Sequence, residues 1–141
     1  MAHDMLTIHV PGDIRGKARP RFGRGPGGHV RVYTNAKTTN AEAWVKQCAV
    51  EAVGSPCLEG PLSLAVAITV SIPASWSKRK QADALTGLLR PTGKPDADNT
   101  LKLLADALNG IVWRDDAQLV DVRVVKSYGA VPGAVLLVGT I

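Results

Sequence analysis

The sequence predicts a single α+β domain over residues 1–141, in which helices pack against one mixed β-sheet. Segments with apolar residues at every second position alternate with segments whose apolar residues recur at helical spacing, and this mixture predicts both strands and helices. The length of 141 residues fits one domain that buries a core of its own. Apolar residues make up 45% and charged residues 21%, as in a globular protein rather than a disordered or fibrous one.

The N-terminal third predicts a strand, a loop and a helix. Residues 5–10 alternate apolar and polar side chains, which is typical of a strand. Residues 16–33 hold many glycines and prolines among basic residues, and we expect a basic loop there that contains a short hairpin. A helix then begins after Thr34 or Asn35 and is closed by Gly54. Its expected apolar side consists of Ala41, Val45, Cys48 and Ala52.

The middle of the chain predicts a strand and a short helix. A strong strand is expected at residues 61–72, because alternating apolar residues share one face and Pro73 ends the run. That face consists of Leu62, Leu64, Val66, Ile68 and Val70. Residues 75–89 predict an amphipathic helix that is entered through Ser75 or Ser77.

The aspartate-rich segment predicts a helix followed by two strands. Asp98 is placed to cap a helix that ends near residues 109–110. Its core face has the i, i+3, i+4, i+7 spacing and consists of Leu101, Leu104, Ala105 and Leu108. Its other side is lined by Asp98, Lys102 and Asp106. With half-buried strands at residues 120–124 and 134–141, the expected order is β-(basic loop)-α-β-α-α-β-β.

Charge is distributed unevenly along the chain. The formal net charge is +5, yet six of the 12 acidic residues are aspartates between Asp96 and Asp121. Seven basic residues and no acidic ones lie between Arg15 and Lys37, and a second basic group follows at residues 78–80. One such group alone fits a solvated loop equally well, but two groups flanking an acidic site favour contact with nucleic acid. The candidate DNA-binding residues are Lys17, Arg19, Arg21, Arg24, Lys78, Arg79, Lys80 and Lys94.

The aspartates predict a site for a hard divalent cation. Mg²⁺ takes oxygen ligands and is held by one or two carboxylates together with water and substrate phosphates. We expect Asp96 and Asp98, two apart in an extended lead-in to the helix, to project to the same side. The chain is long enough to bring Asp115 or Asp116 back to them, and a carboxylate from across a dimer interface stays open as an alternative. Lys102, one turn after Asp98, is placed to stabilise charge that develops on a phosphate.

These residues also have plain structural interpretations. Asp98 can be a helix cap alone, and Lys102 can form ion pairs at i,i+4 spacing along the helix. Asp115 and Asp116 can belong to an ordinary turn. From the residues alone the chain is interpreted as a metal-dependent nuclease; a DNA-binding accessory protein without chemistry and a structural protein without a nucleic-acid partner are the alternatives.

The sequence predicts a cytoplasmic protein without a membrane partner. No apolar run approaches the ~18 residues needed to span a bilayer, and the N-terminus lacks the pattern of a signal peptide. Cys48 and Cys57 form neither a metal-binding pattern nor a disulfide framework, which favours a reducing compartment.

A combination of motifs resembles one nuclease family. It comprises Lys94-Pro95-Asp96-Ala97-Asp98-Asn99, Leu101-Lys102, Asp106-Ala107-Leu108 and Trp113-x-Asp115-Asp116-Ala117-Gln118-x-Val120-Asp121. In these motifs the chain resembles the RusA family of Holliday junction resolvases, from about residue 5 to residue 128. Residues 17–21 and 75–80 look like features of its phage and prophage members.

The resemblance implies a small dimeric endonuclease that uses Mg²⁺ or Mn²⁺ to cut four-way DNA junctions symmetrically, in recombination and repair. A C2 homodimer fits this substrate because a junction offers two equivalent strands to cut. The implied catalytic residues are the metal-binding Asp96, Asp98 and Asp116 and the essential Lys102, with Asn99 and Asp115 in support. A broader nuclease for branched or flap DNA on the same scaffold is the alternative enzyme.

Overall fold

A four-stranded mixed sheet forms the frame of the protein, with its strands in the order β1-β6-β4-β5. The computed structural model describes residues 5–14, 21–24, 30–33 and 36–141, and for 21–24, 30–33 and 36–39 it describes the backbone. The four strands are β1 (Met5–Pro11), β4 (Leu62–Ser71), β5 (Leu119–Gly129) and β6 (Gly133–Thr140). β6 runs antiparallel to both of its neighbours, whereas β4 and β5 are parallel, so the prediction of a mixed sheet is confirmed.

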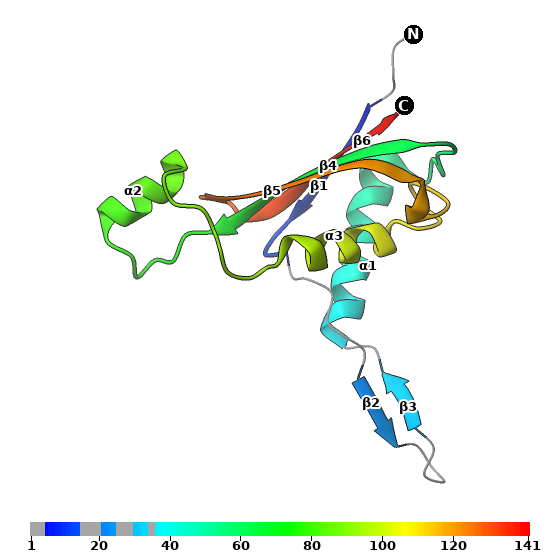
Figure 1. Ribbon diagram of the computed structural model, residues 1–141, viewed down its shortest axis with the longest axis horizontal. Coiled ribbons are helices and arrows are strands. Elements are labelled where there is room, and N and C mark those ends of the chain that lie inside the picture. The colour runs from blue at the N-terminus through cyan, green and yellow to red at the C-terminus, as the bar shows by residue number, and fades with distance from the viewer. Residues whose placement is uncertain (1–4, 15–20, 25–29, 34–35) are drawn as a thin grey trace.

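Helices cover one side of the sheet and bridge its parallel pair. Parallel strands need a crossover connection, and the chain between β4 and β5 contains α2 (Lys78–Thr86) and α3 (Ala97–Ala107). Helices α1 (Ala36–Val53) and α3 lie on the same side of the sheet, where α1 packs against β1 and α3 packs against β5 (Figure 1). Helix α2 extends beyond one end of the sheet (Figure 1). A 3-10 turn, η2 (Asp116–Gln118), precedes β5.

The hydrophobic core lies between the sheet and helices α1 and α3. The alternating side chains Leu62, Leu64, Val66 and Ile68 of β4 are at most 2% exposed, which confirms the predicted strand and most of its buried face, and Val70 is partly buried against the core. Leu104 and Leu108 are fully buried as predicted, and the indole of Trp113 joins the same core at 0% exposure. The core thus fixes one face of α3, while its opposite face, with Lys102, stays exposed.

The first helix agrees with its predicted length but not with its predicted face. α1 ends at Val53, and Gly54 follows with φ of +71°, as a C-terminal glycine commonly does. Ala49 is buried, whereas Ala52, predicted to lie on the apolar side, is exposed. That part of the prediction is wrong, because the buried positions continue from Cys48 and Ala49 to Val53 and leave Ala52 facing solvent.

The later elements are confirmed with changes in extent. α2 begins after Ser77, whose side chain accepts a hydrogen bond from the amide of Lys80 at 3.2 Å, and it ends at Gly87. The strand predicted at residues 120–124 forms part of the longer edge strand β5. Its residues Val120 and Val122 are 62% and 38% exposed rather than half-buried, since α3 covers this edge only in part.

The basic loop contains the short hairpin that the sequence predicts. Its strands are β2 (Arg21–Arg24) and β3 (Val30–Tyr33), which pair antiparallel. Of the predicted DNA-binding residues, Lys17 and Arg19 lie outside the described residues, and Arg21 and Arg24 fall where the backbone alone is described. Within the described part of the chain, no helix is long and apolar enough to cross a membrane.

Candidate active site

The first segment of the candidate site is the start of α3. The helix begins at Ala97 with Asp96 at its N-cap, and the amide of Thr100 donates to the Asp96 carbonyl at 3.0 Å. The prediction that Asp98 is the cap is therefore wrong, because Asp98 already lies in the first helical turn. The extended lead-in predicted for both residues is also wrong, because Asp96 is extended whereas Asp98 is helical. The Asp96 carboxylate accepts a hydrogen bond from the side-chain amide of Asn99 at 3.2 Å.

The second segment is the turn that carries Asp115 and Asp116. The Asp115 side chain accepts a hydrogen bond from the backbone amide of Ala117 at 3.2 Å, and the Gln118 side chain accepts from the backbone of Asp115 at 3.0 Å. This reciprocal arrangement is a capping box, which satisfies amides at the start of a helical turn. The interpretation of Asp115 and Asp116 as part of a turn is thus confirmed, and the turn places Asp116 at its first helical position.

Gln118 ties this turn to a distant loop. Its side-chain oxygen accepts from the amides of Arg114 and Asp115 at 2.9 and 3.0 Å. Its side-chain nitrogen donates to the carbonyls of Leu58 and Gly60 at 2.9 and 3.0 Å. The carboxamide therefore uses both lone pairs and both N–H groups, and it holds the Asp115-Asp116 turn in one place relative to the start of β4.

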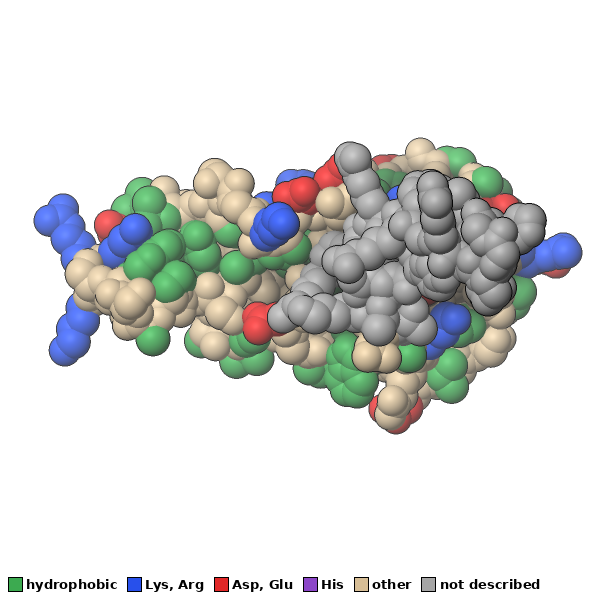
Figure 2. Space-filling model, turned by 90° about the horizontal axis from the view of Figure 1, so that it is seen from below, with side chains coloured by type: hydrophobic (Ala, Val, Ile, Leu, Met, Phe, Trp, Pro, Cys, Tyr) green, Lys and Arg blue, Asp and Glu red, His purple; other side chains and the backbone are tan. Residues whose placement is uncertain are grey.

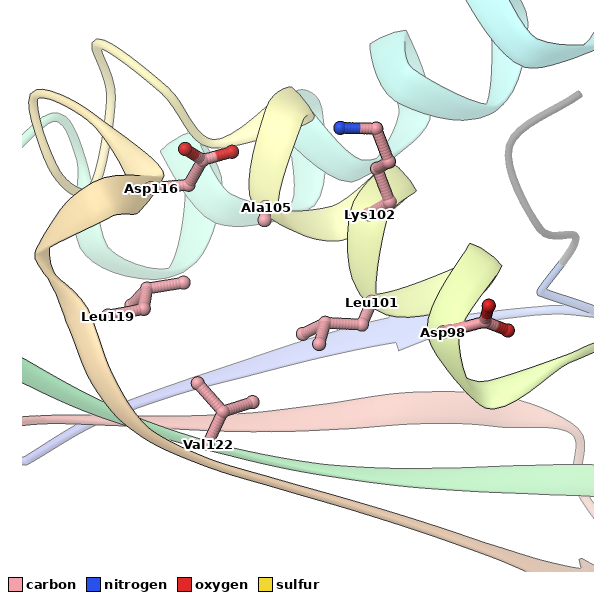
Figure 3. A pocket seen from close by; sticks show the side chains of 7 residues that line it. All are labelled: Asp98, Leu101, Lys102, Ala105, Asp116, Leu119 and Val122. Carbon is pink, nitrogen blue, oxygen red and sulfur yellow. The ribbon is translucent and has the colours of Figure 1, made fainter. Parts of the chain in front are cut away.

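The two segments meet at a cleft of about 300 Å³ between α3 and β5. Figure 3 shows Leu101, Leu119 and Val122 in the space between the helix and the strand, with Asp116 and Lys102 above them. Asp98 belongs to the lining from the helix turn before Lys102, and Figure 3 shows its carboxylate pointing away from Asp116. Three of the four residues predicted to be catalytic, namely Asp98, Lys102 and Asp116, thus line one cleft, and Asp96 does not line it.

Carboxylates crowd around Asp116. Its pKa is raised by the hydrogen bond that it shares with the Asp115 side chain, then by burial, and then by hydrogen bonding to and repulsion from the carboxylate of Asp106. The pKa of Asp115 is lowered, mainly by the hydrogen bond that its carboxylate accepts from the Ala117 amide. Lys102 compensates part of this negative charge, because its ammonium lies 3.8 Å from the Asp106 carboxylate.

The donor set of the cleft fits a hard divalent cation. Within the described residues, no three His, Cys, Asp or Glu side chains stand close enough together to form a complete cage. Mg²⁺ does not need such a cage, since it is usually held by one or two carboxylates plus water and substrate phosphates. Asp98 and Asp116 line the same cleft, with their carboxylates at its opposite ends in Figure 3. A cation bound at Asp116 would offset the negative charge that Asp115 and Asp106 place around it.

Sequence reasoning missed three residues that shape the site. Asp106 was placed on the correct side of the helix, but its closeness to Asp116 depends on the tertiary path of the chain. Gln118 stood inside a recognised motif without a role. Nothing in the sequence pointed to Lys126, whose ammonium donates to the carbonyls of Gly93 and Pro95 at 2.8 and 2.9 Å.

Basic side chains lie exposed beyond the cleft. Lys78, Arg79 and Lys80 form the first turn of α2, and the Lys80 ammonium lies 4.0 Å from the centre of the Trp76 ring. Figure 2 shows Lys and Arg side chains at the end of the molecule that α2 occupies. Lys94 is exposed in the loop before α3. Lys78, Arg79, Lys80 and Lys94 are therefore accessible to a polyanion.

Together, the fold and the cleft define a single-domain α+β protein with an acidic, lysine-containing site and exposed basic side chains. The family model described as Endodeoxyribonuclease RusA matches residues 11–138, nearly the whole chain. The chain is also 37% identical over 131 residues, 92% of each chain, to YqaN of Bacillus subtilis (strain 168), which is described as an uncharacterized protein. The chain therefore belongs to the RusA endodeoxyribonuclease family.

Proposed function

We propose that this protein is a divalent-metal-dependent endonuclease that cuts four-way DNA junctions, with Asp98, Lys102 and Asp116 in its active site. The observation that carries the proposal is that these three residues, from two separate segments, line one cleft in a chain of an endodeoxyribonuclease family. Membership of that family supports nuclease activity, and the choice of junctions over other branched DNA rests on the family alone.

In the proposed mechanism, Asp98 and Asp116 would hold the cation, and Asp96, which lies outside the cleft at the N-cap of the same helix, would supply a further carboxylate. The cation, Mg²⁺ or Mn²⁺, would polarise the scissile phosphate and lower the pKa of a water molecule. Lys102 is 66% exposed, so its flexible ammonium can leave Asp106 and approach a phosphate that enters the cleft. There it stabilises the negative charge that builds up as water attacks.

Asp115 and Asn99 have supporting roles in this proposal. Asp115 caps the turn that presents Asp116, and Asn99 donates to the Asp96 carboxylate. Groups that orient the residues of a metal site in this way commonly affect metal affinity strongly.

We also propose that the protein acts as a homodimer. A four-way junction has two equivalent strands to cut, and two copies related by a twofold axis present two equivalent sites. Lys78, Arg79, Lys80 and Lys94 would contact phosphates outside the cleft, together with basic residues of the loop at 16–33.

The test uses labelled four-way junction, flap and linear duplex DNA, each incubated with and without Mg²⁺. We expect paired nicks in the junction that need the metal and are lost in Asp98→Asn and in Lys102→Met. Preferred cleavage of the flap would favour the broader branched-DNA nuclease instead. Junction binding without any cleavage at any Mg²⁺ concentration would refute the enzyme and leave a DNA-binding accessory protein.

A further inference from the structure

Two of the proposed metal-binding residues come directly after one loop. Asp96 and Asp98 follow the irregular segment Gly93–Pro95, and α3 starts only at Ala97. The later part of α3 is anchored by its buried leucines, whereas Asp96 lies before the first helical residue. The direction in which the chain enters the helix therefore sets where the Asp96 carboxylate points.

Lys126 holds this loop from the neighbouring edge strand. It lies in the middle of β5, opposite Ile68 of β4 in the register of the sheet, and its side chain is partly buried. Its ammonium donates to the carbonyl of Gly93 at 2.8 Å and to that of Pro95 at 2.9 Å. Hydrogen bonds from a charged donor are shorter and stronger than neutral ones, so one side chain fixes the two carbonyls that flank Lys94.

Lys126 differs from Lys102 in its surroundings. Lys102 lines the cleft and is largely exposed, as a residue that meets a substrate phosphate must be. Lys126 does not line the cleft, and its ammonium is engaged with backbone carbonyls. Its geometry suits a residue that acts through the loop rather than on the reacting atoms.

We propose that Lys126 is a positioning residue, which holds Gly93–Pro95 against β5 and so places Asp96 and Asp98 for the cation. This inference rests on the proposed function, because it concerns the same metal site. A merely structural lysine would affect the stability of the whole domain, whereas a positioning lysine affects the loop and the affinity for metal.

The test compares Lys126→Met with wild type and with Lys46→Met, which removes one positive charge from the exposed face of α1. Amide hydrogen exchange is measured on the metal-free proteins, and Mn²⁺ affinity is measured by calorimetry without DNA. In Lys126→Met we expect faster exchange confined to residues 90–102 and Mn²⁺ affinity about tenfold weaker, as for the loss of an outer-sphere partner. Lys126→Arg, which keeps a charged donor, should recover most of both properties, and Lys46→Met should match wild type.

Unchanged exchange at residues 90–102 would overturn the proposal, and so would unchanged Mn²⁺ affinity. Faster exchange spread evenly over the domain would show a merely structural role and overturn it as well. If Lys126→Met does not fold, Lys126→Gln is judged by the same two measurements. Because neither measurement uses DNA, a wild type that cuts none of the DNA substrates would refute the proposed function separately from the role of Lys126.

Discussion

Replacing Gln118 with alanine is expected to destabilise the protein and to impair the proposed site at once. The change removes four hydrogen bonds, each of which contributes about 0.5–1.5 kcal/mol net. Three of them involve exposed groups, which water can satisfy after the truncation, while the bond to the Leu58 carbonyl is partly buried. We therefore expect the free energy of unfolding to fall by about 2–3 kcal/mol, which is near the lower end of the summed contributions of the four bonds. For a domain of this size that corresponds to a fall in Tm of roughly 6–12 °C.

The assay is urea unfolding followed by tryptophan fluorescence, with Gln47→Ala as the matched control. Gln47 makes one exposed side-chain hydrogen bond, to Glu51 on α1 at 3.2 Å, so the same substitution there should change stability by less than about 0.5 kcal/mol. Gln118→Glu keeps the accepting oxygen but directs a negative oxygen at two carbonyls, and it should lose at least as much stability as Gln118→Ala. If Gln118→Ala unfolds at the same urea concentration as Gln47→Ala, the hydrogen-bond network does not hold the turn as we describe.

Three further outcomes are expected. Trp113→Ala should lose about 3–5 kcal/mol in chemical denaturation, because its indole is fully buried in the core; a loss below about 1 kcal/mol would contradict that packing. Asp116→Asn should abolish junction cleavage yet leave the metal-free protein at least as stable as wild type at neutral pH. The reason is that a carboxyl with a raised pKa contributes stability at low pH that is lost as the pH rises through that pKa. A lower free energy of unfolding in this variant would refute the crowding of carboxylates around Asp116. Changing Lys78, Arg79 and Lys80 together to glutamine should weaken junction binding. The slope of log K against log salt concentration should also fall by about 0.9 for each phosphate that the variant no longer neutralises. An unchanged slope would show that α2 is not part of the DNA-binding surface.

The sequence predicted the parts of this fold that depend on local periodicity. The buried face of β4 was correct from Leu62 to Ile68, and so were Leu104 and Leu108, because a period of two or of 3.6 residues reports directly which side chains face the core. Leu101, predicted to face the core, is only partly buried against it and lines the cleft, and Leu103 is buried without having been predicted. The helix cap was two residues off, since Asp96 and Asp98 are equally good cap residues and local chemistry does not distinguish them.

The parts that failed depend on contacts between distant segments. The exposure of Val120 and Val122 follows from the position of β5 at the edge of the sheet, which alternation alone does not reveal. The same holds for Lys126, because its hydrogen bonds exist only once β5 pairs with β4 and passes beside the loop before α3. For the candidate site, the sequence thus predicted which residue types take part. Which of these residues lie close together depends on the tertiary structure.

The place of β6 in the sheet has a consequence for how the chain is made. Among the strands of the described residues, β6 comes last in the sequence but lies between β1 and β4, where it joins both through hydrogen bonds. During synthesis, all the candidate site residues are therefore translated before the strand that completes the sheet beneath them. A ribosome stalled before Gly133, or a message truncated there, yields a chain without β6. In that chain β1 lacks the strand with which it pairs, and the sheet next to the cleft is incomplete. The proposed cutting activity therefore requires translation through Thr140, because β6 is an inner strand of the fold.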